Sequence, residues 1–256
     1  MKGERISFPL PVVAFRPPYR AFEAIARPLA LRSCDLAPGT VLGVTVREPP
    51  AAAVPALDIG VPRLRSHFPA QPVIVLFDRG GDDAVRLARR AGVLGARAVL
   101  VRDDPPYPVL RRILTNPVDL GADVVDWLAL RGVSPHPEAF YAIREIFRLA
   151  LEFRNVEPLL ESVGMVGSTV RHHLQAAGLP APGRWLALAR ALHAALRLQR
   201  EDVSVLTLAL DFGYSDHGSL SRQMLRLFGV RPGEIGGLLG WEWLVDRWVA
   251  RVGRIP

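Results

Sequence analysis

One stretch of the chain, residues 204–232, limits the possible fold more than any other. Its sequence is SVLTLALDFGYSDHGSLSRQMLRLFGVRP, and apolar residues recur at helical spacing on both sides of Gly213. Ser204 is a suitable cap for a first helix, and Gly213 suits the left-handed conformation at which that helix would end. Gly229 and Pro232 then favour the end of a second helix. The stretch therefore predicts two short helices joined by a tight turn, which is a helix-turn-helix.

The second of these helices has a predicted buried stripe and a polar leading edge. Ser215 is its expected N-cap, and Asp216 is favourable in its first turn because a helix N-terminus carries partial positive charge. The apolar residues expected to face the core are Leu206, Leu208, Ala209 and Phe212 in the first helix, and Leu220, Met224, Leu227 and Phe228 in the second.

These residues resemble the second helix-turn-helix of the AraC/XylS family of bacterial transcription regulators. The resemblance covers about residues 155–235 and implies an all-α DNA-binding domain with two helix-turn-helix units. The matching segments are Leu208-Ala209, Gly213-Tyr214-Ser215-Asp216, Leu220-Ser221-Arg222 and Phe228-Gly229-Val230-Arg231-Pro232.

Residues 156–178, VEPLLESVGMVGSTVRHHLQAAG, repeat the pattern where the family has its first helix-turn-helix. The family favours a small Ala at the position of Leu160 and a capping Ser at the position of Val166. A larger side chain is expected to open the helix pair, and a lost cap costs about 1 kcal/mol. Ser168 is an alternative cap. Whether this unit still contacts bases is left open by the sequence.

A helical stripe between the two units, residues 183–199, predicts a connecting helix about 25 Å long at about 1.5 Å per residue. Such a rod suits two recognition helices about one DNA turn apart, near 34 Å. The N-terminal residues of a recognition helix reach base edges, and an Arg can donate two hydrogen bonds to guanine. The predicted DNA-contacting residues are Ser168, Arg171 and His172 in the first unit, and His217, Gly218, Ser219, Ser221 and Arg222 in the second; Arg184, Arg190 and Arg226 are candidates for contacts with the phosphate backbone.

The N-terminal half predicts a different fold. Apolar segments rich in β-branched residues alternate with helical ones, which is typical of βαβ units and a small parallel sheet. A helix is expected over residues 20–30, and the Pro/Ala-rich residues 47–57 are expected to form a loop. The expected strands are residues 10–15, 40–47, 72–78 and 96–102.

Residues 63–103 of this half resemble the last part of a response-regulator receiver domain. In that comparison Thr45 stands where receiver domains have their phosphoacceptor Asp, and Arg16 stands where they have a pair of acidic residues. Phe77 replaces a Thr or Ser of the family, and Arg102 replaces its conserved Lys. Without clustered carboxylates no Mg²⁺ site can form, so the resemblance implies a degenerate receiver without phosphotransfer. An unrelated small α/β domain is the alternative.

The domain boundary is expected at residues 132–137, GVSPHP, because this segment has two prolines and no apolar periodicity. We therefore expect an α/β regulatory domain over residues 1–131 and a helical DNA-binding domain over residues 138–256. The helix-turn-helix units occupy about residues 156–178 and 204–230 of the second domain.

The formal net charge is +7, and every basic residue except Lys2 is Arg, which permits binding to nucleic acid. Cys34 is the only cysteine, so no internal disulfide is possible. No apolar run approaches the length of a membrane span, and we expect a cytoplasmic protein. His172 and the adjacent His173 have no evident third ligand, so neither a metal nor another cofactor is predicted. The side chains at the ends of the expected strands do not form a combination suited to catalysis, and we do not expect the protein to be an enzyme.

The sequence thus predicts a sequence-specific DNA-binding transcription regulator that places two recognition helices in the major groove of double-stranded DNA. Its N-terminal domain would supply signal reception or homodimerisation, and the small-molecule effector is not identified by the sequence. The alternative is a protein-interaction module whose degenerate helix-turn-helix domain no longer binds DNA.

Overall fold

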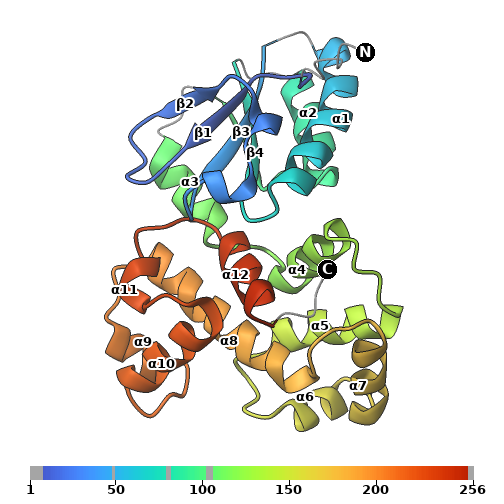
Figure 1. The fold of residues 1–256 in the computed structure, drawn as a ribbon, viewed down its shortest axis with the longest axis vertical. Helices are drawn as coiled ribbons and strands as arrows, with labels where there is room; N and C mark the ends of the chain where they lie inside the picture. Colours follow the sequence, from blue (N-terminus) through green and yellow to red (C-terminus); the bar gives the residue numbers. More distant parts are fainter. Residues whose placement is uncertain (1–7, 48–49, 79–81, 102–105, 253–256) are drawn as a thin grey trace. The chain divides into compact units, whose positions relative to one another are not determined.

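The chain forms two compact units, and each is described separately. Unit 1 consists of Met1–Leu114 together with Leu238–Gly240, and unit 2 of Thr115–Gly237 together with Trp241–Pro256. A mixed α/β unit followed by a helical one confirms the predicted fold class (Figure 1). The residues described by this computed structural model are 8–47, 50–78, 82–101 and 106–252.

Unit 1 is built on a five-stranded sheet with the order β2-β1-β3-β4-β5. The pairs β3–β4 and β4–β5 are parallel, whereas β1 runs antiparallel to both β2 and β3. The sheet is therefore mixed. The strands are β1 (Val12–Phe15), β2 (Phe22–Ile25), β3 (Val41–Val46), β4 (Val73–Phe77) and β5 (Ala98–Val101).

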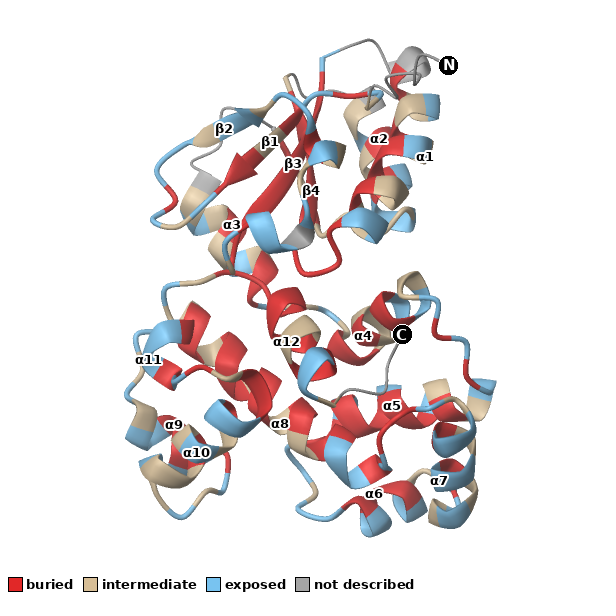
Figure 2. Ribbon diagram, viewed as in Figure 1, coloured by how far each residue is buried: buried red, intermediate tan, exposed pale blue. Residues whose placement is uncertain are grey.

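Helices cover both faces of this sheet, so β3 and β4 are buried along their whole length (Figure 2). Helices α1 (Pro50–His67) and α2 (Asp82–Val93) pack on the face that presents Val44 and Val75. Helix α3 (Pro106–Leu114) packs on the face that presents Ile74 and Leu76. Burial on both faces explains the near-continuous apolar sequence of these two strands.

The prediction of a wholly parallel sheet, with a helix over residues 20–30, was wrong for the first two strands. The chain reverses directly after β1, where the N–H of Tyr19 donates to the carbonyl of Arg16 at 2.6 Å. This turn brings β2 back beside β1, and the ring of Phe22 stacks on Phe15 with centroids 4.5 Å apart. A hairpin thus replaces the expected crossover helix, and only short 3₁₀ helices follow, at Pro28–Ala30 and Ser33–Asp35.

The loop expected over residues 47–57 also differs, because helix α1 begins at Pro50. The helix contains Pro55 and Pro62, which local propensity would exclude from a helix interior. Burial against the sheet outweighs this cost. The side chains that α1 buries at helical spacing are Ala53, Leu57, Val61 and Leu64, all fully inaccessible to solvent.

The resemblance to a receiver domain is not confirmed by the sheet. The strand order is that of a flavodoxin-like, doubly wound sheet, but β1 has the opposite direction. Thr45, at the phosphoacceptor position, is only 2% exposed, and Arg16, at the position of the acidic pair, is itself an arginine that pairs with Glu23 at 3.3 Å. Arg102 lies outside the described residues.

Unit 2 begins before the predicted linker at residues 132–137, because helix α4 packs with the helices that follow it. The carboxylate of Asp119, which caps α4, lies 2.8 Å from Arg144 of α5. Gly121 packs so closely on α5 that a β-carbon there would lie 2.7 Å from the carbonyl oxygen of Arg144. The helices of unit 2 are α4 (Leu120–Leu130), α5 (Pro137–Leu149), α6 (Val156–Ser162), α7 (Gly167–Ala176), α8 (Pro182–Arg200), α9 (Val205–Asp211), α10 (His217–Phe228), α11 (Pro232–Ile235) and α12 (Glu242–Val252).

The C-terminal helix α12 closes the core of unit 2. Trp243 and Trp248 of this helix are both buried. The ring of Trp248 meets Trp185 of α8 edge-on, with centroids 4.8 Å apart. The side chain of Asp246 pairs with Arg131, at the end of α4, at 3.6 Å. Helix α12 therefore joins α4 to α8.

Tyr19 holds the segment Leu238–Gly240 within unit 1. Its hydroxyl donates to the carbonyl of Gly39 and accepts from the backbone N–H of Leu239, both at 2.8 Å. Its backbone has φ 58°, a conformation that L-residues rarely adopt. Burial raises the pKa of the phenol, so the hydroxyl stays protonated and continues to donate at neutral pH.

We predict that Tyr19→Phe destabilises the protein by about 1–3 kcal/mol, because it leaves the buried carbonyl of Gly39 and N–H of Leu239 without a partner. The measurement is the urea midpoint of unfolding. Tyr107→Phe is the matched control, since Tyr107 stacks on Tyr19 with centroids 5.3 Å apart and is only half-buried. Equal midpoints for wild type and Tyr19→Phe would show that the hydroxyl contributes nothing.

Candidate nucleic-acid interface

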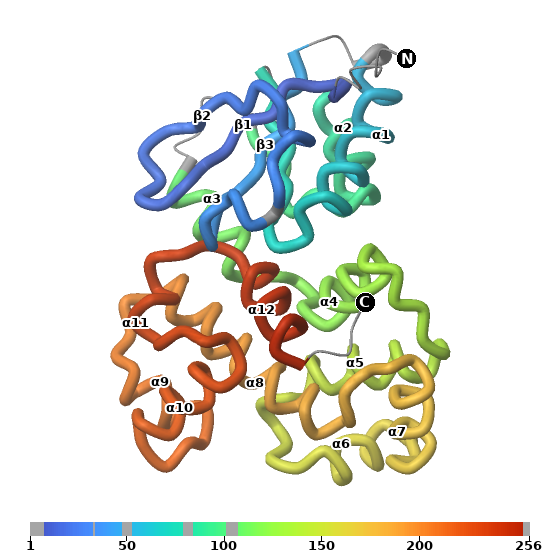
Figure 3. Tube along the Cα trace, in the orientation of Figure 1, coloured from blue at the N-terminus to red at the C-terminus, as the bar shows by residue number. Residues whose placement is uncertain are grey.

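Two short helix pairs, α6–α7 and α9–α10, pack on the long helix α8 (Figure 3). Helix α8 extends from Pro182 to Arg200, close to the predicted residues 183–199. Its buried side, which includes Trp185, Leu188 and Leu192, is the core against which both pairs rest. The structure thus has the two helix-turn-helix segments and the connecting helix that the sequence predicts.

Both pairs turn through the same backbone motif. In α6, the N–H of Gly164 donates to the carbonyl of Glu161 and the N–H of Met165 to the carbonyl of Leu160. In α9, Gly213 and Tyr214 donate in the same way to Leu210 and Ala209. Each turn depends on a left-handed glycine, with φ 73° at residue 164 and 72° at residue 213. This is the Schellman motif, which satisfies carbonyls that the helix end would otherwise leave free.

The second pair is capped at both of its helix starts. The hydroxyl of Ser204 accepts from the N–H of Thr207 at 3.0 Å, as predicted. The cap of α10 is Asp216 rather than the predicted Ser215: its carboxylate accepts from the N–H of Ser219 at 2.8 Å. Ser215 instead donates to Asp216 at 2.8 Å and so orients the cap. The left-handed Gly229, φ 70°, ends α10 as expected.

Gly218 is required by this cap. A β-carbon at this position would lie 2.8 Å from Oδ1 of Asp216 and 3.3 Å from Nη1 of Arg222. The carboxylate has little freedom to withdraw, because it also accepts from both Ser215 and Ser219. Gly218 therefore has a structural role besides the DNA contact that the sequence predicts.

The predicted contact residues of α10 lie at its N-terminal end. His217 and Arg222 are exposed, whereas Gly218, Ser219 and Ser221 are partly buried. Arg222 donates to the hydroxyl of Ser219 at 3.0 Å, so its guanidinium lies back over the first turn of the helix. The hydroxyl of Ser221 donates its hydrogen to the carbonyl of His217, so this hydrogen is not free to bind another acceptor. Arg222 and His217 thus have the most available side chains among these five residues.

The first pair is less regular, as predicted. Val166 stands at the N-cap of α7 without a side-chain cap bond, and Ser168 is exposed inside the helix. Leu160 is buried, and a β-carbon on Gly167 would lie 3.9 Å from its Cδ1, so the small Gly167 faces the large side chain. Arg171 is exposed and lies 3.8 Å from Glu157.

His172 and Arg222 hold equivalent positions on their helices. His172 comes two residues before the buried Leu174, and Arg222 comes two residues before the buried Met224. Both side chains are exposed. Because a residue's direction on a helix is set by its offset from the buried stripe, the two pairs present these side chains in corresponding directions.

The phosphate candidates differ in their availability. Arg184 is exposed at the start of α8, and Arg226 is exposed with one bond to Gln223. Arg190 donates instead to the backbone carbonyls of Phe153 and Phe212, so its guanidinium is committed to the fold.

Arg154 is a candidate that the sequence reasoning missed. It is exposed just before α6, yet its Nη2 would lie 3.9 Å from a β-carbon on Gly213, in the turn of the second pair. Only the tertiary fold places this side chain beside that turn.

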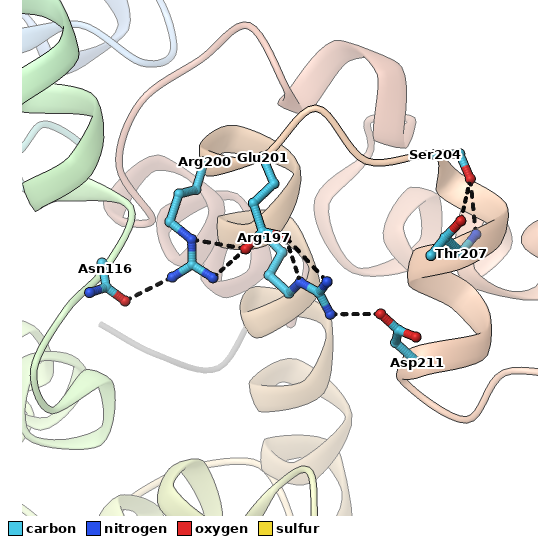
Figure 4. A network of polar contacts seen from close by, with 7 residues as sticks. All are labelled: Asn116, Arg197, Arg200, Glu201, Ser204, Thr207 and Asp211. Carbon is cyan, nitrogen blue, oxygen red and sulfur yellow. Dashed lines mark hydrogen bonds and ion pairs between the residues drawn. The ribbon is translucent and has the colours of Figure 1, made fainter.

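Charged side chains at the end of α8 hold α9 in place (Figure 4). Arg197 donates to Asp211 of α9 at 2.8 Å and to Glu201 at 3.2 Å. Arg200 donates to Glu201 and, through Nη1, to the side chain of Asn116 at 2.8 Å. The C-terminal end of α9 therefore rests on an ion-pair network anchored in α8.

Two arginines of α12 contact the C-terminal end of α10. Arg247 lies 3.5 Å from the carbonyl of Phe228, the last residue of α10. The guanidinium of Arg251 occupies the space where a β-carbon of Gly229 would stand. Positive charge at a helix C-terminus interacts favourably with the helix dipole. Helix α10 is thus held at its far end while its N-terminal end stays accessible.

Residues 159–236 match the family model of a helix-turn-helix domain. The match begins within α6, continues through α7, α8 and the second pair, and supports an AraC-type DNA-binding domain, a class of regulator domains rather than of enzymes. No curated protein and no solved structure shows a significant match to the chain. The helix-turn-helix domain therefore rests on the family model and on its own geometry.

Among the described residues, no helix is both long enough and apolar enough to cross a bilayer.

We predict a pH-dependent contribution from the cap of α10. Hydrogen bonds from Ser215 and Ser219 lower the pKa of Asp216 to about 2. A carboxylate whose pKa is lower in the folded than in the unfolded protein stabilises the fold above its unfolded pKa, about 3.9, and loses that contribution as pH falls through about 2.

Asp216→Asn should therefore lower the urea midpoint above pH 4, and the difference from wild type should shrink between pH 4 and pH 2. Asp202→Asn, at an exposed acidic residue outside the cap, is the control and should show no such trend. A constant difference for Asp216→Asn over this range would contradict the assigned role.

Proposed function

We propose that the protein is a transcription regulator that binds double-stranded DNA sequence-specifically through two recognition helices, α7 and α10. The observation that carries this proposal is the repetition within the helix-turn-helix domain. The same glycine turn, at Gly164 and Gly213, precedes a second helix with an exposed basic side chain at an equivalent position, His172 or Arg222. A helix with this arrangement suits insertion into the major groove.

The roles of the side chains follow from their placement. Arg222 would leave Ser219 and donate its two parallel N–H groups to O6 and N7 of guanine. Arg171 and His172 would serve the equivalent part of the first recognition helix. Arg154, Arg184 and Arg226 would bind phosphates and set the position of the domain on the duplex.

The length of α8 supports simultaneous binding of both helices. Its 19 residues extend about 28 Å at about 1.5 Å per residue. This is close to the roughly 34 Å between successive major-groove sites on one side of B-DNA. A single recognition helix covers few base pairs, so two helices on one frame would give a longer and more selective site.

For unit 1 we propose signal reception or homodimerisation without phosphotransfer. The burial of Thr45 and the pairing of Arg16 with Glu23 support a role other than phosphate transfer. Dimerisation is tested by light scattering of the full chain over a range of concentrations. A monomer mass at every concentration, with and without DNA, would leave signal reception as the proposed role.

The DNA-binding proposal predicts that Arg222→Ala weakens binding to the selected site by about 5- to 150-fold, since a bidentate base contact is worth about 1–3 kcal/mol. Arg171→Ala should weaken the same complex. The site is first selected from a random-sequence DNA library with the full chain, and affinity is then measured by fluorescence anisotropy at fixed salt.

Arg226→Ala is the matched control on the same helix. Loss of a phosphate contact should weaken all sequences alike and reduce the slope of log affinity against log salt by about 1. If Arg222→Ala and Arg171→Ala both bind the selected site as tightly as wild type, these two residues do not contact bases as proposed. Absence of any salt-dependent DNA binding by wild type would instead favour the protein-interaction module.

A further inference from the structure

A cluster of three potential metal ligands joins the beginning of α5 to α7. His136 precedes α5, Glu138 lies in its first turn, and His173 lies in the last turn of α7. One potential ligand atom from each residue lies within 4.8 Å of the other two. The sequence alone offers His172 and His173 no third ligand, because the partners come from a distant segment. We propose that His136, Glu138 and His173 form a Zn²⁺ site.

Two of the three groups already have the separation of zinc ligands. Nε2 of His173 lies 3.3 Å from Oε2 of Glu138. Two ligands of a tetrahedral zinc, at about 2.0–2.1 Å from the ion, are roughly 3.4 Å apart. An ion can therefore be inserted between these atoms with little movement of either residue.

The third ligand requires a rotation. The ring of His136 stacks on His173 at 4.1 Å with only 8° between the planes, so the in-plane lone pairs of the two rings do not converge. His136 is exposed and is held by one long bond, in which its Nδ1 accepts from the N–H of Glu138 at 3.3 Å. Ligation through Nε2 would leave the proton on Nδ1 and give up this bond.

The donor set selects the class of ion. Two neutral imidazoles and one carboxylate suit Zn²⁺, which takes nitrogen and oxygen ligands in tetrahedral geometry. Mg²⁺ and Ca²⁺ prefer oxygen ligands and are poorly matched by two imidazoles. Three protein ligands leave one position of the ion for water.

A bound ion would cross-link the start of α5 to the end of α7. Because it would bind the folded chain and not the unfolded one, it would stabilise unit 2 by an amount that grows with the logarithm of the free ion concentration above Kd. Any effect on DNA affinity rests on the proposed role of α7 in DNA binding, whereas the metal site itself does not.

The test uses the full chain without an affinity tag, after removal of metal with a chelator, in a Cys34→Ser background that removes the exposed thiol. Isothermal titration with ZnCl₂ at pH 7.5 should give one ion per chain. Glu138→Gln, His136→Ala and His173→Ala should each lower the affinity at least about 10-fold, since even outer-shell changes cost about 10- to 100-fold. His172→Ala, the adjacent exposed histidine outside the cluster, is the matched control and should bind as wild type does.

Two further measurements separate a lost ligand from a lost fold. Co²⁺ in place of Zn²⁺ should give the visible absorption of a tetrahedral site in wild type and in His172→Ala, but not in His173→Ala. At a Zn²⁺ concentration only slightly above the Kd of wild type, Zn²⁺ should raise the Tm of wild type more than that of Glu138→Gln, while circular dichroism shows both to be folded.

Absence of stoichiometric Zn²⁺ binding by wild type, or equal losses in His172→Ala and His173→Ala, would overturn the site. Because these measurements contain no DNA, a protein that binds Zn²⁺ but no DNA would retain the site and refute the proposed function. A protein that binds DNA but no Zn²⁺ would retain the proposed function and refute the metal site.

Discussion

The placement of both helix pairs depends on the guanidinium of Arg190. From α8 it donates to the carbonyl of Phe153, between α5 and α6, and to the carbonyl of Phe212, at the end of α9. A charged donor binds such carbonyls strongly, and the last carbonyls of a helix have no partner within the helix itself. One side chain thus fixes the start of the first pair and the turn of the second to a single frame. The ion pair of Arg197 with Asp211 and the contact of Arg247 with Phe228 add to this frame.

The parts of the fold that could be predicted from sequence are those determined by neighbouring residues. Ser204, Gly213 and Gly229 fix the limits of α9 and α10 through caps and left-handed turns, and these predictions were confirmed. The predictions that were wrong involved competition between local preference and distant contacts. Helix α1 keeps Pro55 in its interior because the sheet buries the apolar side of the helix. Leu206, expected in the core, is 51% exposed, because Leu208 and Ala209 take the buried side of a helix too short to bury both faces.

The candidate site was predictable to the extent that exposure follows helical periodicity. His217 and Arg222 are exposed as expected, since the buried stripe of α10 determines the opposite side of the helix. The role of Arg190 could not be found in this way, because its acceptors are backbone carbonyls, which have no sequence signature. The same limit applies to Arg154 and to the ligands of the proposed zinc site. His136 and His173 stack on each other only because α5 and α7 pack together.

The bond between Tyr19 and Leu239 has a consequence for synthesis of the chain. The two residues are 220 positions apart, yet both belong to the core of unit 1. While the ribosome is still producing unit 2, the growing unit 1 lacks Leu239 and the N–H that its buried phenol requires. Unit 1 can therefore complete its core only after Leu239 has been made, although N-terminal domains usually fold first during translation. Contacts of such long sequence separation also slow folding, so the last folding step of unit 1 waits for the segment Leu238–Gly240.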